Sequence, residues 1–127
     1  MYNIDNHGLI CGRLVDEIKT FTNSDGSRRL LFTVASQDSF RGRNGNKGTQ
    51  FIPLTAFVPS GRGSTIYDRI HKGDKVSVSY SLRNNNYTDR AGLAHYDIEI
   101  FAEDVKIQEP KSVTAARHAA LAAEVAS

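Results

Sequence analysis

The chain has 127 residues, of which 39% are hydrophobic and 24% charged, a size and balance typical of one globular domain. This composition excludes a disordered or collagen-like chain, and no stretch approaches the roughly 18 apolar residues of a transmembrane helix. Sixteen Lys and Arg against fourteen Asp and Glu give a net charge of +2, a slight preference for polyanions. The single cysteine, Cys11, excludes an internal disulfide and a multi-cysteine zinc site, and we expect no cofactor and no metal. The N-terminus lacks the features of a secretory signal, so we expect a cytoplasmic protein that does not contact a membrane.

The first half of the chain alternates apolar and polar residues, the pattern of half-buried β-strands. Three strands are predicted here, at residues 9–22, 29–37 and 50–58. The first is expected to bend near Gly12, and the sequence Asn-Ser-Asp-Gly at 23–26 predicts a hairpin turn. Residues 41–49 hold three cations and three glycines without one acid, which indicates a flexible basic loop.

The second half begins with a helical pattern and returns to alternation. Residues 64–72 predict a short helix that ends at Gly73. Two further strands are predicted, at 75–83 and from about Ala94 through Ile107, with a polar loop at 84–92 between them. Residues 112–126 contain seven alanines and predict a marginal helix that needs a docking surface to persist.

The predicted order is strand, strand, strand, short helix, strand, strand. Five strands joined by long hairpins favour a small all-β barrel. We therefore predict an OB-fold, a five-stranded Greek-key barrel, with the short helix between the third and fourth strands. We divide the chain into this barrel domain at residues 1–110 and a C-terminal tail at 111–127, Ala-rich and either helical or flexible.

The third strand places aromatic rings on the face opposite to the core. Its uninterrupted aliphatic row must face inward, at Ile52, Leu54, Ala56 and Val58. Phe51 and Phe57 then point away from the core. Phe40 lies where the second strand enters the basic loop, and Tyr87 lies in the polar loop between Arg83 and Arg90.

Aromatic rings beside cations suit an unpaired nucleic acid strand. A ring stacks on any base for about 1–3 kcal/mol, and nearby Lys and Arg neutralise phosphates. The alternative is that Phe51 and Phe57 cover a second sheet or a subunit interface. The residue pattern leaves both interpretations open.

Several segments together carry a family resemblance. They are the first strand from Gly8 to Leu14, the second from Phe32 to Phe40, the third from Phe51 to Phe57, the helix end and strand entry from Tyr67 to Val76, and the series Leu82-Arg83, Tyr87-Thr88-Asp89, Gly92 and Tyr96. Their order and spacing resemble the single-stranded DNA-binding protein (SSB) family of bacteria and phages, over about residues 7–109. The chain departs from well-known members in having no tryptophan.

The resemblance implies an OB-fold that binds single-stranded DNA without catalysis, in replication, recombination or repair. It implies base stacking by Phe40, Phe51, Phe57 and Tyr87, the four rings already selected, and phosphate contacts by Lys72 and Arg83. The predicted loops add further candidate phosphate contacts, at Arg41, Arg43, Lys47, Arg62 and Arg90.

The resemblance also implies a homo-oligomer, a tetramer in preference to a dimer. The acidic tip by which the family's cellular members recruit replication proteins is not found here: either the sequence is truncated or this protein does not recruit partners in that way. A phage or mobile-element protein is one reading, located at the nucleoid or at phage replication sites. The alternative function is an SSB-like interaction module of a primosome or other replication assembly. Cys11 is expected to be a small buried residue, or to lie near its mate across a dimer axis, and Asp97 and Glu99 are expected to be solvated charges.

Overall fold

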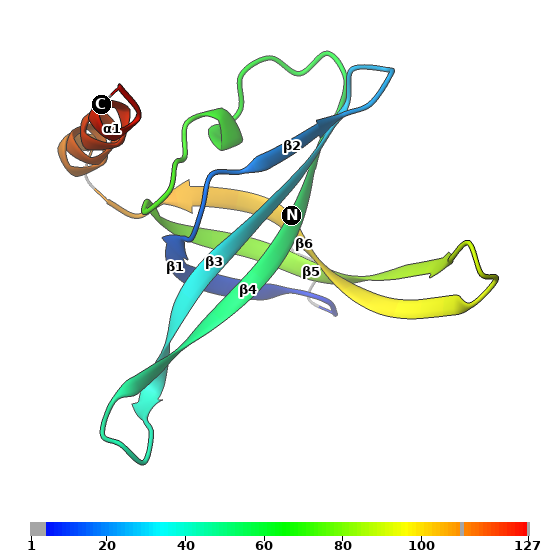
Figure 1. Cartoon of the computed structure of the whole chain (residues 1–127), viewed down its shortest axis with the longest axis horizontal. Coiled ribbons are helices and arrows are strands. Elements are labelled where there is room, and N and C mark those ends of the chain that lie inside the picture. Colours follow the sequence, from blue (N-terminus) through cyan, green and yellow to red (C-terminus); the bar gives the residue numbers. More distant parts are fainter. Residues whose placement is uncertain (1–4, 110, 127) are drawn as a thin grey trace.

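The computed structural model describes residues 5–109 and 111–126 of the chain. One mixed sheet contains all six strands in the order β1-β5-β6-β4-β3-β2, and its neighbours are antiparallel except β4 and β6, which are parallel where they meet. An additional pairing of β1 with β3 joins the two sides, so that β1, β5, β6, β4 and β3 form a closed five-stranded barrel consistent with an OB-fold (Figure 1). The elements are β1 (Gly8–Leu14), β2 (Lys19–Thr22), β3 (Arg28–Arg41), β4 (Lys47–Val58), the 3-10 helix η1 (Ile66–Asp68), β5 (Lys75–Thr88), β6 (Ala94–Ile107) and α1 (Lys111–Ala126).

Barrel closure depends on a close crossing of β1 over β3. Leu14 pairs with Val34, and the preceding Arg13 pairs with Ala35 while still paired to Lys75 of β5. A Cβ atom at Gly12 would lie 2.1 Å from the carbonyl oxygen of Ala35. Only glycine therefore allows the two backbones to approach in this way.

The predicted single strand over residues 9–22 is wrong, because the chain forms two strands separated at residues 15–18. β1 pairs mainly with β5, whereas β2 pairs with β3, from Lys19↔Leu31 to Thr22↔Arg28. Both sides of the break pair with β3, at Leu14↔Val34 and at Lys19↔Leu31. The extra residues between these two pairs cannot fit the β3 ladder, so the strand is interrupted there. The turn predicted at 23–26 is confirmed, with Gly26 at φ +90°.

The barrel interior follows the predicted alternation. The fully buried apolar residues come from every barrel strand and from Ile70 after η1: Leu14, Leu30, Phe32, Val34, Leu54, Ala56, Val58, Ile70, Val76, Val78, Ala102 and Val105. Cys11 is the exception, because it is exposed and not buried as predicted. Its position in β1 alternates with the inward-facing residues, and its Sγ lies 3.0 Å from the Ser77 hydroxyl on the outer face.

The helix predicted over residues 64–72 is reduced to the single turn of η1. The Asp68 carboxylate accepts a hydrogen bond from the Thr65 amide at 2.8 Å, and the Asp74 carboxylate accepts one from the His71 amide at 2.9 Å. Such side-chain bonds to the backbone compete with a continuous helix.

Two hairpins, β3–β4 and β5–β6, extend from the barrel as long arms in different directions (Figure 1). Their strands reach into both predicted loops, so that only residues 42–46 and 89–93 remain outside strands. The two loop predictions, which rested on composition, were too long because cross-strand pairing stabilises polar segments as strands. The ladder runs from Arg28↔Val58 to Arg41↔Lys47 in the first arm and reaches Thr88↔Ala94 in the second.

The C-terminal helix α1 is confirmed, and it is held to its own barrel by side chains. Arg117 donates hydrogen bonds to Glu109 at 2.6 and 2.9 Å and to Asp74 at 3.1 Å, and His118 lies 2.8 Å from Asp74. Asp74 is completely buried. Burial raises the pKa of Asp74, but hydrogen bonds from His118, the His71 amide and Arg117 outweigh burial and lower it overall. We refer to Asp74, Glu109, Arg117 and His118 as the Asp74 cluster.

Candidate nucleic-acid interface

The outer face of the sheet carries a continuous row of rings and cations. Residues directly opposite each other in a sheet share a face, and Phe57 lies opposite Arg29, while Thr55 lies opposite Phe101. Phe51 lies further along the same face and is 63% exposed, and Phe57 is 50% exposed. Their predicted orientation away from the core is confirmed. A proline is tolerated between them, at position 53, because β4 is registered with β6 only at Thr55.

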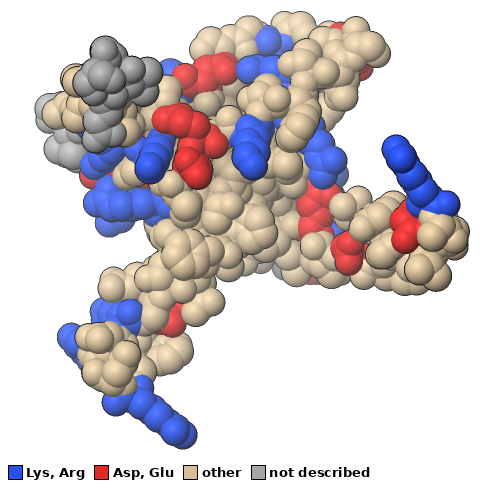
Figure 2. Space-filling view, in the orientation of Figure 1, with Lys and Arg blue, Asp and Glu red and all other residues tan. Residues whose placement is uncertain are grey.

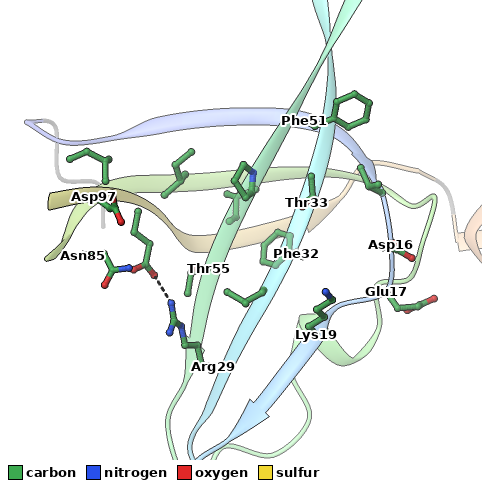
Figure 3. A pocket seen from close by; sticks show the side chains of 17 residues that line it. Asp16, Glu17, Lys19, Arg29, Phe32, Thr33, Phe51, Thr55, Asn85 and Asp97 are labelled. Atoms are coloured by element: carbon green, nitrogen blue, oxygen red, sulfur yellow. Dashed lines mark ion pairs between the residues drawn. The ribbon is translucent and has the colours of Figure 1, made fainter. Parts of the chain in front are cut away.

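A hollow of about 810 Å³ lies along this face, between the β1–β2 connection and β6. Figure 3 shows Phe51 near one end, Thr33 and Thr55 along the strands, and Arg29 and Asp97 toward the other end. Its apolar walls suit the face of a base. Its charged edges carry four carboxylates against two cations, so this hollow does not attract a phosphate.

The centre of the face contains two further side-chain pairs. Arg29 lies 4.0 Å from Glu99 (dashed in Figure 3), and the Arg83 guanidinium carbon lies 3.9 Å from the centroid of the Phe101 ring. Both pairs border a smaller hollow of about 320 Å³ beside Phe57. The prediction that Glu99 is a solvated charge is therefore wrong, because the tertiary fold pairs it with an arginine in a groove.

The β5–β6 arm presents Tyr87 on the same face of the sheet as Arg83 and Phe101. Positions 83, 85 and 87 share this face because side chains alternate along a strand. Tyr87 is 48% exposed, and its ring stacks on His95 with the centroids 4.6 Å apart and the planes 8° from parallel. The imidazole Nε2 lies 2.8 Å from an Asp89 carboxylate oxygen. That hydrogen bond, with others from the amides of the turn, lowers the pKa of Asp89.

The β3–β4 arm carries the remaining ring, Phe40, which is 68% exposed. Arg41, Arg43 and Lys47 follow it within the same hairpin, and Arg41 donates a 2.8 Å hydrogen bond to the carbonyl of Gly45. Figure 2 shows several Lys and Arg side chains at the tip of the β3–β4 arm and one at the tip of the β5–β6 arm, whose turn contains Arg90. The structure thus places cations at both ends of the row of rings.

Two predicted phosphate contacts, Arg62 and Lys72, lie outside the two arms. Arg62 lies in the segment after β4 and lines a hollow of about 500 Å³ that also includes Phe57, Arg83 and Phe101. Lys72 lies in the turn before β5, where its amide donates to Glu17 and the next residue, Gly73, lies against Arg117 of α1. The structure brings Arg62 to the row of rings and leaves Lys72 at the α1 end of the barrel.

The family of this chain follows from its similarity to known proteins. The family model described as the Single-strand binding protein family matches residues 5–108. This chain belongs to that family.

Relatives agree with this assignment. A protein of Caldanaerobacter subterraneus subsp. tengcongensis named single-stranded DNA-binding protein is 30% identical over 108 residues, covering 84% of this chain and 70% of that protein. Proteins of the same name from Bacteroides thetaiotaomicron (30% identity, 84% of this chain and 67% of the relative) and Malacoplasma penetrans (31% identity, 80% and 50%) are also similar.

Sequence analysis of this family member missed four residues of the face: Phe21, Arg29, His95 and Phe101. Phe21 is 53% exposed and lies opposite Arg29 in the β2–β3 ladder. Phe101 could have been found by alternation, since it shares its strand parity with Glu99. His95 and Arg29 had no signal in the sequence, because their roles depend on cross-strand neighbours.

In the described part of the chain, no three His, Cys, Asp or Glu side chains gather as a metal site. Among the same residues, none of the helices is long and apolar enough to span a membrane.

Proposed function

We propose that this SSB family member binds single-stranded DNA largely without sequence preference, by stacking bases on Phe40, Phe51, Phe57 and Tyr87. Family membership supports DNA binding in replication-type processes. The observation that carries the stacking proposal is that all four rings are 48% to 68% exposed, although exposed rings of this size are costly in water.

Phosphate neutralisation accompanies the stacking. We assign it to the cations of the arms and the groove: Arg41, Arg43, Lys47, Arg62, Arg83 and Arg90. Lys72 is assigned from the family resemblance, and its contact requires the DNA to pass the α1 end of the barrel. The protein would act without catalysis, as a Greek-key OB-fold domain at residues 1–110 followed by the tail at 111–127.

We further propose self-association, as a tetramer in preference to a dimer. Leu9 on β1 is 65% exposed, and Leu82, Tyr96 and Ile98 are exposed on the β5–β6 arm, on the face opposite to Tyr87. In the described chain, β1 is paired on one side with β5 over Gly8–Arg13 and on the other only at Arg13 and Leu14. An open strand edge beside apolar side chains is suited to pairing with another copy.

The decisive experiment is a titration of the full chain with oligo-dT over a series of salt concentrations, combined with light scattering for the mass. The proposal is supported if oligo-dT binds tightly, if its affinity falls steeply with salt, and if single-stranded DNA displaces it while duplex DNA does not. Salt-independent or duplex-preferring binding would reject it and favour the interaction-module alternative.

A further inference from the structure

Phe101 and Arg83 lie together at the middle of the row of rings, between Phe57 and the β5–β6 arm. Phe101 is half-buried, and it is registered with Thr55 on one side and Ser81 on the other. The Arg83 guanidinium carbon is 3.9 Å from the ring centroid, which is direct contact. A cation over an aromatic face at this distance is held electrostatically, so this arginine differs from the arginines at the arm tips.

The space next to this pair has a suitable size and charge. The hollow of about 320 Å³ is bordered by Phe57, Arg83 and Phe101, at the lower end of the range of small-ligand pockets. Arg29 and Glu99 also border it and lie 4.0 Å apart. With two guanidinium groups and one carboxylate, its net charge is positive, which suits an anionic nucleotide.

Guanidinium groups stack on unpaired bases as aromatic rings do. A guanidinium used in this way has to keep its plane fixed, and a free arginine on the surface loses rotamer entropy when it is fixed. Contact with Phe101 restricts Arg83 before DNA arrives. Phe101 is therefore a positioning residue, which acts on the ligand through Arg83.

We infer that Phe57, Arg83 and Phe101 form one base subsite, the central subsite, in which the nucleobase that stacks on Phe57 is held on its other face by the Arg83 guanidinium. This inference rests on the proposed DNA binding and adds a role to Arg83 beyond phosphate contact. Planar stacking, and not charge alone, is what Arg83 contributes there.

Charge-preserving variants separate stacking from charge. Arg83→Lys keeps the charge and removes the plane, and Phe101→Leu keeps an apolar side chain and removes the ring. We expect each to weaken oligo-dT binding about two- to tenfold while the dependence of affinity on salt keeps its slope. Phe101→Tyr, which retains the ring, should recover the affinity that Phe101→Leu loses. Arg69→Lys, at an exposed arginine near η1 and outside the proposed interface, should bind like the unmodified protein.

The double variant Arg83→Lys/Phe101→Leu decides whether the two residues act together. If Phe101 works through Arg83, the double variant loses no more affinity than the worse single variant. Multiplied losses, or an Arg83→Lys protein that binds as tightly as Arg69→Lys, would overturn the subsite. If Phe101→Leu does not fold, Arg83→Lys and Phe101→Tyr still decide it.

Phe51→Ala is the control for the proposed function. Loss of binding in Phe51→Ala with full binding in Arg83→Lys rejects the central subsite alone. Full binding in both variants rejects the stacking platform as a whole.

Discussion

The rings of Tyr87 and His95 stack across the β5–β6 ladder, 4.6 Å apart and 8° from parallel. His95 is in turn fixed by Asp89, whose carboxylate also accepts hydrogen bonds from the Ala91 and Leu93 amides of the turn at 2.9 and 3.0 Å. The turn thus holds the histidine, and the histidine supports one face of the tyrosine ring. Only the other face of Tyr87 is left for a base.

This stack predicts that His95 contributes to DNA binding through Tyr87. His95→Ala should weaken oligo-dT binding about two- to fivefold, since ring pairs contribute about 0.5–1.5 kcal/mol. His95→Phe should restore most of it, because a phenyl ring supports Tyr87 equally well. Fluorescence anisotropy with a labelled oligonucleotide measures both. In a Tyr87→Ala background, His95→Ala should have no further effect, and an additional loss there would show that His95 contacts DNA by itself.

The stacking assignment predicts a face-specific result in the β5–β6 arm. Tyr87→Ala and Phe51→Ala should each cost about 1–3 kcal/mol of binding free energy, with unfolding temperatures unchanged because both rings are exposed. Tyr96 is the matched control, as a neighbouring tyrosine that is 80% exposed on the opposite face of the same hairpin. If Tyr96→Ala weakens binding as much as Tyr87→Ala, with the oligomeric mass unchanged, the assigned face is wrong.

The cations at the arm tips predict the salt dependence. Each phosphate contact removed from a single strand lowers the slope of log affinity against log salt by about 0.7. We expect this decrease in Arg43→Gln and Arg90→Gln, and no change in Arg69→Gln, an exposed arginine near η1. Lys72→Gln should give a smaller decrease, because Glu17 lies beside it. Unchanged slopes in both arm variants would place the DNA path away from the arms.

The Asp74 cluster predicts that α1 contributes to stability. Arg117→Ala leaves the completely buried Asp74 carboxylate short of a donor, and the free energy of unfolding should fall by about 1–3 kcal/mol. Urea unfolding measures this, and Arg69→Ala serves as the control for loss of an exposed arginine. An Arg117→Ala protein as stable as the control would mean that α1 is not held by this cluster.

Glu109 predicts how that stability depends on pH. Hydrogen bonding to Arg117, together with the Lys75 amide and the charges of Arg117 and Arg13, lowers the pKa of Glu109 from 4.5 to about 2. Because the folded-state pKa lies below the unfolded one, this stabilisation is complete above about pH 4.5 and is lost as the pH falls toward 2. Urea unfolding at pH 6, 4 and 3 should show this loss, and Glu109→Gln should flatten it. An equal acid-side loss in Glu109→Gln would assign the effect to other carboxylates.

Much of the barrel and its stacking face could be predicted from residue alternation. Side chains alternate across a strand whatever its neighbours are, so the outward orientation of Phe51 and Phe57 followed from the aliphatic row at Ile52, Leu54 and Ala56. The turn at Gly26 could also be predicted from the local sequence. The length of the strands could not be predicted, because the polar segments at 84–88 and 47–49 become strand only when they pair with a partner.

The sequence by itself determined that the chain forms a β-barrel with exposed rings and that it resembles the single-strand binding proteins. Periodicity is a property of one strand at a time and motif order is a property of the linear chain, so neither depends on how the strands pack. Only the tertiary structure decided that Arg83 lies over Phe101, that His95 supports Tyr87, that Glu99 pairs with Arg29, and that Asp74 receives Arg117 from a helix 43 residues away. Each of these contacts joins residues from two different strands or, for Asp74 and Arg117, from the turn before β5 and a helix. Register and closure of the barrel set those distances, and no local pattern in the chain encodes them.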